Sequence, residues 1–139
     1  MNSFKLTAIG NLARNPELIT EGDVTFARFC LVGDDMATSG EDDPLRDVVT
    51  SIWFLAFDPI ATAIAHGAKK GDQLILEARV ISTHWTSRQQ GKQLGSVYIV
   101  TGFRFGARRG EHGPATACRG EPPTKPLVDA ALAALEETT

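Results

Sequence analysis

One helix-forming segment interrupts a chain whose other regular segments alternate in the manner of β-strands. Residues 58–70, "DPIATAIAHGAKK", begin with Asp58, whose carboxylate can cap free backbone N–H groups, and with Pro59, which suits the first helical position. The Ala-rich sequence that follows predicts a short helix ending near Gly67 or Gly71. Three strand-like segments precede this helix and two follow it, an order that few folds accept.

Alternation of apolar side chains between two faces identifies those strand-like segments. They lie at residues 4–9, 24–32, 48–57, 73–85 and 96–105. Between them, we expect a loop or bulge at residues 10–18, an exposed acidic loop at 33–47 and a polar, basic hairpin loop at 86–95. The order β-β-β-α-β-β predicts an all-β fold, a five-stranded OB-fold barrel with one short helix between strands 3 and 4. An SH3-like barrel, the alternative, lacks a helix at that place.

The 139 residues suggest one domain with a tail. Residues 1–106 are expected to form the barrel domain, and residues 107–139, rich in Gly, Pro and charge, a flexible tail. Within the tail, residues 127–137 have the spacing of a short helix that either docks or frays. No apolar run approaches the roughly 18 residues of a membrane span. The N-terminus "MNSFKLTAIG" shows no signal-peptide pattern, so a cytoplasmic location without membrane contact is expected.

The sequence offers no catalytic or metal-binding pattern. Cys30 and Cys118 are far apart and have no metal-like spacing, which predicts two free thiols. The three histidines are scattered, and no nucleophile motif or phosphate-binding glycine loop occurs. We therefore expect no enzyme activity, no catalytic residues, no metal and no cofactor.

The net charge of −3 conceals an uneven distribution. Residues 34–47 hold six acidic side chains and one basic side chain. The rest of residues 1–110 holds 11 basic and 6 acidic side chains, a net charge of +5. Because local charge matters more to a polyanion than total charge does, the barrel is compatible with nucleic acid.

The stretch "SIWFLAFDP" at residues 51–59 is apolar on both faces of the expected strand. If its even-numbered residues fill the barrel, Trp53 and Phe57 point outward, as does Trp85 at the end of the fourth strand. Exposed aromatic rings beside cations suit unpaired bases on a charged backbone. A second sheet or a subunit covering this face, with the cations as solvated surface charges, is the alternative. The candidate DNA-binding residues are Trp53, Phe57, Trp85, Lys5, Arg28, Arg79, Arg88 and Lys92.

Two stretches resemble the bacterial single-stranded DNA-binding protein family. "AIGNLARNPEL" at residues 8–18 is similar to that family's G-N-L-x-x-D-P-E turn. Residues 56–85 are similar to its aromatic-ended third strand, crossing helix, K-G turn and fourth strand with a terminal Trp. The resemblance covers about residues 1–105 and implies that Phe57 and Trp85 are base-stacking positions. It also implies a homotetramer or homodimer acting in DNA replication, recombination or transfer.

The chain departs from that family's pattern in three places. Ser51 stands where the family often has Trp, and the aromatic residue usual near Ala37 is missing. The C-terminus lacks the acidic Pro-Phe tip that recruits replication proteins, so partners in replication or recombination are in doubt. A divergent member from a mobile element would fit these departures. A hypothesis of another class is an OB-fold adaptor, resembling primosome proteins, that binds protein partners and only weakly binds nucleic acid.

Overall fold

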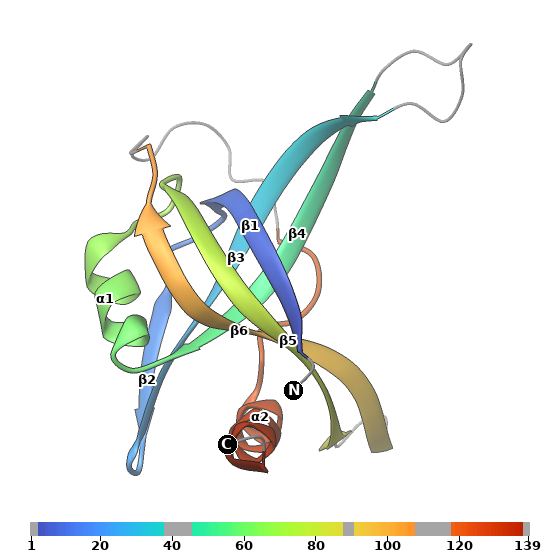
Figure 1. The fold of residues 1–139 in the computed structure, drawn as a ribbon. Helices are drawn as coiled ribbons and strands as arrows, with labels where there is room; N and C mark the ends of the chain where they lie inside the picture. Colours follow the sequence, from blue (N-terminus) through green and yellow to red (C-terminus); the bar gives the residue numbers. More distant parts are fainter. Residues whose placement is uncertain (1–2, 38–45, 88–90, 108–117, 138–139) are drawn as a thin grey trace.

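The computed structural model describes residues 3–37, 46–87, 91–107 and 118–137 (Figure 1). Six strands and two helices follow one another along these residues. They are β1 (Phe4–Leu12), β2 (Glu17–Glu21), β3 (Val24–Ala37), β4 (Arg46–Phe57), α1 (Ile60–Gly67), β5 (Gln73–Ser87), β6 (Gly91–Phe105) and α2 (Lys125–Glu137). Neither helix in these ranges is long and apolar enough to cross a membrane.

Five of the strands close into a barrel. The sheet order is β1-β5-β6-β4-β3-β2, and β1 pairs again with β3 through Asn11 and Val32, which joins the two sides of the sheet. Gly10 lies against Leu31 and Val32 at this seam. All pairs are antiparallel except β4 and β6, which run parallel at Leu55 and Ile99. The predicted OB-fold barrel is confirmed, with α1 between the third and fourth barrel strands.

The barrel interior is filled by the alternate residues that the sequence pattern assigned to it. The rings of Phe29 and Phe54 stack with centroids 5.7 Å apart, and both side chains are fully buried. Helix α1 closes one end of this core with Ala61 and Ile64. The inner core consists of Leu12, Ala27, Phe29, Leu31, Phe54, Ala56, Ala61, Ile64, Ala68, Leu74, Leu76, Ala78 and Val100.

Helix α1 ends where the sequence predicted but begins at Ile60, one residue later than expected, because Pro59 occupies the N-cap position rather than the first helical position. Oδ1 of Asp58 accepts hydrogen bonds from the backbone N–H of Thr62 at 3.0 Å and from its hydroxyl at 2.6 Å. The helix ends at Gly67. In the turn that follows, Gly71 has a φ of 92°, a conformation that side chains disfavour, and its N–H donates to the carbonyl oxygen of Leu12 at 2.9 Å. This turn therefore fixes β1 against the start of β5.

The predicted loops at 10–18, 33–47 and 86–95 are too long. β1 continues to Leu12, and Glu17–Glu21 forms the extra strand β2 on the edge of β3. β3 continues to Ala37 and β4 begins at Arg46, and the two form a hairpin that projects beyond the barrel in Figure 1. Likewise, β5 continues to Ser87 and β6 begins at Gly91. The backbone ladder of a hairpin needs no apolar side chains, so alternation underestimates its length. Residues 38–45 and 88–90 lie outside the described residues.

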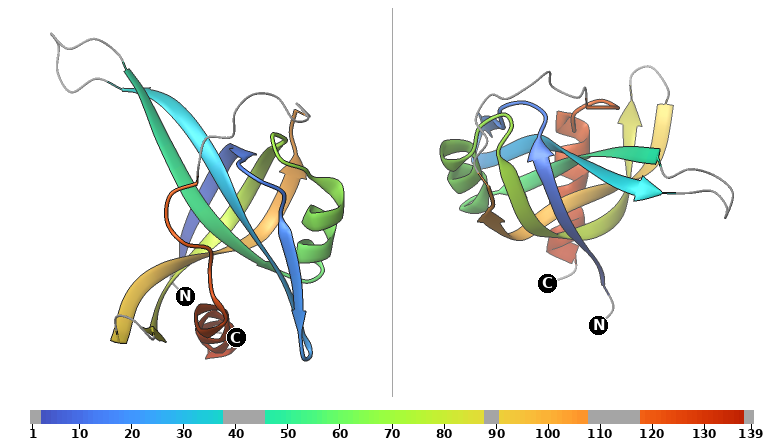
Figure 2. Two further views of the ribbon diagram at one scale, coloured as in Figure 1. Left: turned by 180° about the vertical axis from the view of Figure 1, so that it is seen from behind. Right: turned by 90° about the horizontal axis from the view of Figure 1, so that it is seen from above.

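Residues 118–137 pack against the outside of the barrel. Helix α2, close to the expected 127–137, lies between the β2–β3 hairpin and the ends of β5 and β6 (Figures 1 and 2). Its fully buried Val128 and Ala131 contact apolar side chains of the outward strand faces. This outer cluster consists of Phe26, Leu55, Val97, Ile99, Val128 and Ala131, bordered by Ile19, Val24, Phe57, Ile81, Leu127, Leu132 and Leu135.

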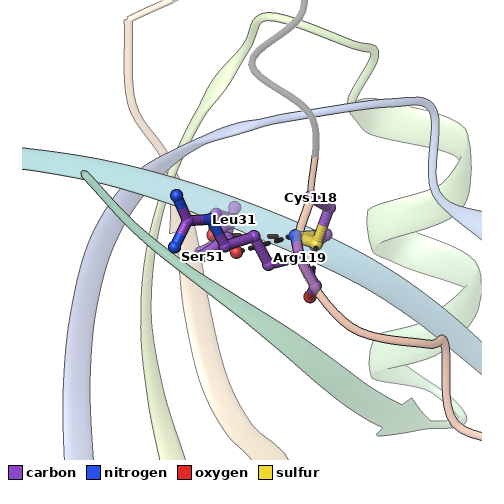
Figure 3. Close-up of a disulfide and its surroundings, with 5 residues drawn as sticks. Leu31, Ser51, Cys118 and Arg119 are labelled. Carbon is purple, nitrogen blue, oxygen red and sulfur yellow. Dashed lines mark hydrogen bonds between the residues drawn. A yellow bond between two sulfur atoms is a disulfide. The ribbon is translucent and has the colours of Figure 1, made fainter.

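The prediction of two free thiols is wrong. Cys30 and Cys118 form a disulfide with Cα atoms 6.2 Å apart, although 88 positions separate them in the sequence (Figure 3). Cys30 points out of the barrel from β3 and is fully buried beneath the segment that carries Cys118. Sequence spacing could not reveal the bond, because it depends on where the tail packs.

Candidate functional site

Outward residues of all six strands align in one row across the sheet, here called the outer row. Register pairs join each strand to the next on the face opposite the inner core. The outer row consists of Lys5 of β1, Arg79 of β5, Ile99 of β6, Leu55 of β4, Arg28 of β3 and Glu17 of β2. Two adjacent cations therefore stand at one end, apolar side chains in the middle and an ion pair at the other end.

Trp53 and Phe57 flank the middle of the outer row. Both lie on β4 two residues from Leu55, so they share its face, with Cα atoms about 13 Å apart at the usual strand rise. Trp53 is paired in register with Cys30 and Phe57 with Phe26 on the neighbouring β3. The two rings thus sit on either side of the outer row, at a separation that leaves room for more than one base.

The Trp53 indole is half-buried and has an unmet hydrogen-bonding capacity. The Arg14 guanidinium carbon lies 5.6 Å from the ring centroid, in cation–π range. Within the described part of the chain, its buried Nε1–H meets no acceptor. The ring borders a cleft of about 380 Å³ whose walls include Ser51, Tyr98 and the tail residues Glu121 to Thr124. An aromatic ring at the border of an open cleft is a suitable surface for a flat ligand.

Phe57 is half-buried at the border of the outer cluster, where α2 packs. Leu55 beside it is fully buried beneath the same helix. The apolar outer face of β4 is therefore covered at Leu55 and partly covered at Phe57. The cover is a segment of the same chain rather than a second sheet or a subunit.

The basic candidates occupy three different environments. Lys5 is exposed and is paired in register with Arg79, which is half-buried. Nε and Nη2 of Arg28 donate to Oε2 of Glu17 at 3.1 and 2.9 Å, and its Nη1 donates to the carbonyl oxygen of Pro123 at 2.8 Å. Arg28 is thus held by an acid and by the tail, whereas Lys5 faces solvent.

The remaining candidates belong to the β5–β6 hairpin. The backbones of Trp85 and Lys92 form part of that ladder, pairing with Gln93 and Thr86 respectively. Their side chains lie outside the described residues, as does all of Arg88. The structure therefore places Trp53 and Phe57 on β4 beside Arg28 on β3, and places Lys5 beside Arg79 on β1 and β5, on the other side of β6 in the sheet. The role of the hairpin residues stays a prediction.

Sequence reasoning missed the contribution of the tail and of Arg14 to this face. Besides the Pro123 carbonyl, the tail supplies Lys125, whose Nζ lies 3.0 Å from Oε2 of Glu21 and 3.5 Å from Oδ1 of Asp129. The hydrogen bond to Glu21 raises the pKa of the Lys125 ammonium group. An outward cysteine beside outward aromatics was the available signal that something covers β3. No group of three or more His, Cys, Asp or Glu side chains among the described residues is arranged to hold a metal.

No protein-family model and no curated protein matches this sequence. Several solved structures do match its fold. The Plasmodium falciparum SSB in complex with ssDNA has a TM-score of 0.66 at 17% identity, covering 77% of this chain and 100% of that one. A small single-stranded DNA-binding protein from Streptomyces coelicolor has a TM-score of 0.59 at 18% identity, covering 79% and 100%. A deletion mutant of the single-stranded DNA binding protein from Thermus aquaticus has a TM-score of 0.66 at 20% identity, covering 76% and 51%. These similarities establish a shared barrel fold.

Proposed function

We propose that this chain binds single-stranded DNA on the outer face of its barrel, as a divergent member of the bacterial single-stranded DNA-binding protein family. The outer row is the observation that carries the proposal. It sets Lys5 and Arg79 side by side and continues into an apolar strand face flanked by Trp53 and Phe57. A charged backbone with unpaired bases needs this combination of cations and aromatic rings.

The binding energy would come from two sources. Bases stacked on Trp53, Phe57 and Trp85 would contribute about 1–3 kcal/mol each. Phosphates would contact Lys5, Arg28, Arg79, Arg88 and Lys92, a contribution that falls as salt rises because bound counterions are released. Nothing in this scheme needs a catalytic group, a metal or a cofactor.

The biological setting follows from the same proposal. Proteins whose names state single-stranded DNA binding share this barrel. The domain at residues 1–106 would bind DNA in replication, recombination or transfer in the cytoplasm, as a homodimer or homotetramer, with residues 107–139 as its tail. Proteins of replication or recombination are the partners expected beside DNA.

An OB-fold adaptor for protein partners is the second candidate. Two observations favour it: Arg28 is already paired with Glu17, and Phe57 already packs at the border of a covered cluster. In that case the outer face would serve protein contacts, and nucleic acid would bind weakly. A stable oligomer whose tryptophan fluorescence does not respond to oligo(dT) would support the adaptor.

Titration with oligo(dT) at two ionic strengths tests the DNA-binding proposal. We expect quenching of tryptophan fluorescence, because bases would stack on Trp53 and Trp85. Five phosphate contacts imply about 100-fold weaker binding when salt rises from about 50 to about 200 mM. A blunt duplex of the same length is the control, since its bases are already paired. Binding without quenching, or without salt dependence, would contradict the assigned face.

A further inference from the structure

Residues 118–137, here called the C-terminal cover, contact the groups proposed to bind DNA. The Pro123 carbonyl accepts a hydrogen bond from Arg28. Residues Glu121 to Thr124 form one wall of the cleft that Trp53 borders. Helix α2 packs on the outer cluster at whose edge Phe57 lies. The cover and a DNA strand would therefore compete for the same residues.

A disulfide ties the cover down at that position. Cys30 is the register partner of Trp53, so the bond to Cys118 is made beside the indole. The next residue, Arg119, donates its backbone N–H to Oγ of Ser51 at 2.9 Å, two positions before Trp53 on β4 (Figure 3). The cover thus crosses β3 and β4 where the cleft opens.

The docking of α2 depends on this tether. A helix of 13 residues is marginal in water without a partner. With the disulfide intact, α2 begins seven residues after a fixed point at Cys118, whereas without it the nearest fixed strand end is Phe105, 20 residues before α2. Because effective concentration falls with about the −3/2 power of linker length, the longer tether weakens docking about fivefold. The hydrogen bonds from Arg119 to Ser51 and from Arg28 to Pro123 would weaken together with the docking of α2.

We infer that the C-terminal cover is a redox-controlled competitor of single-stranded DNA, held closed by the Cys30–Cys118 disulfide and released when a dithiol reduces it. This inference rests on the proposed DNA-binding function and names its regulation. Oxidation closes the face over Trp53, Phe57 and Arg28, and reduction opens it. The acceptor for the reducing electrons is the disulfide itself.

The reduction balances as an ordinary thiol–disulfide exchange. A thiolate of the dithiol attacks the sulfur of Cys118, which is half-exposed, because Cys30 is fully buried. The Cys30 thiolate leaves and takes up a proton, and Cys118 remains in a mixed disulfide. The second thiolate of the dithiol then displaces the Cys118 thiolate, which is also protonated. Two electrons and two protons pass to the protein, and the dithiol ends as a disulfide.

Affinity for fluorescent oligo(dT) in the two redox states of the full chain tests the inference. We expect the chain reduced with dithiothreitol to bind up to about fivefold more tightly than the oxidised chain, because apparent affinity scales with the open fraction and docking of the cover changes by about that factor. The variant Cys118→Ser should bind as the reduced parent does and should ignore dithiothreitol. Amide hydrogen exchange at residues 127–135 should be faster in both reduced parent and variant than in the oxidised parent.

The possible results distinguish a failure of this inference from a failure of the proposed DNA-binding function. Equal oligo(dT) affinity in both redox states, or tighter binding by the oxidised chain, would contradict the inference that the C-terminal cover competes with DNA. The proposed DNA-binding function would remain. Two free thiols persisting after treatment with oxidised glutathione would overturn the inference too. A chain that binds oligo(dT) in neither state overturns the proposed function and this inference together. Because dithiothreitol acts on the unaltered chain, the test does not depend on the folding of the variant.

Discussion

Replacing both Phe57 and Trp85 with alanine is expected to weaken binding of oligo(dT) at least about 30-fold, because two base stacks contribute at least about 2 kcal/mol together. Fluorescence anisotropy of a labelled oligonucleotide measures the effect. The parent and the variant are compared in dithiothreitol, so that the C-terminal cover does not limit either of them. Salt dependence should persist in the double variant, since the phosphate-contacting residues remain.

Two matched controls separate stacking from packing in that experiment. Phe4→Ala removes another aromatic side chain, one that is 79% exposed and outside the proposed site, and should leave affinity unchanged. Phe57→Leu keeps apolar bulk at the border of the outer cluster but removes the aromatic face, and should reproduce the Phe57 part of the loss. If the double alanine variant binds as tightly as its parent, the assigned face is wrong.

Replacing Phe29 with alanine is expected to lower the free energy of unfolding by about 3–5 kcal/mol. The Phe29 ring is fully buried and stacks on Phe54, so its removal loses apolar burial and leaves a cavity between β3 and β4. Urea unfolding followed by circular dichroism measures the change, with the disulfide intact in every sample.

Phe4→Ala again provides the reference for that stability measurement. It deletes the same atoms from an exposed position, and surface substitutions of this kind usually change stability by less than about 0.5 kcal/mol. A loss below about 1 kcal/mol for Phe29→Ala would mean that this ring does not belong to the inner core.

The barrel was predictable because the sequence patterns that specify it lie within single strands and at the start of one helix. Alternation alone placed Ala27, Phe29 and Leu31 on one face, and Phe54 and Ala56 on the face that meets them. The helix was predictable from Asp58, whose carboxylate does accept the hydrogen bond that its position suggested. The OB-fold then followed from where the helix interrupts the chain, although the edge strand β2 was not foreseen.

The tail could be predicted only in part, because its partner is distant in sequence. Helical spacing near Val128 predicted a helix but not the strands that it contacts. Cys30 and Cys118 appeared unrelated because their proximity follows from that docking. The same missing information left the outer face of β4 undecided between exposure and burial. The structure shows a third arrangement, in which the chain covers its own apolar face.

The seam between β1 and β3 has a consequence for how the barrel can vary. A methyl group built on Gly10 would lie 3.0 Å from the Val32 carbonyl oxygen and 3.2 Å from Cβ of Leu31, both on the opposing strand. The oxygen belongs to a paired backbone and the Cβ is bonded directly to that backbone, so neither can swing aside as the end of a long side chain would. A larger residue would therefore have to move the opposing strand slightly outward, so the close approach of β1 and β3 at this position favours glycine.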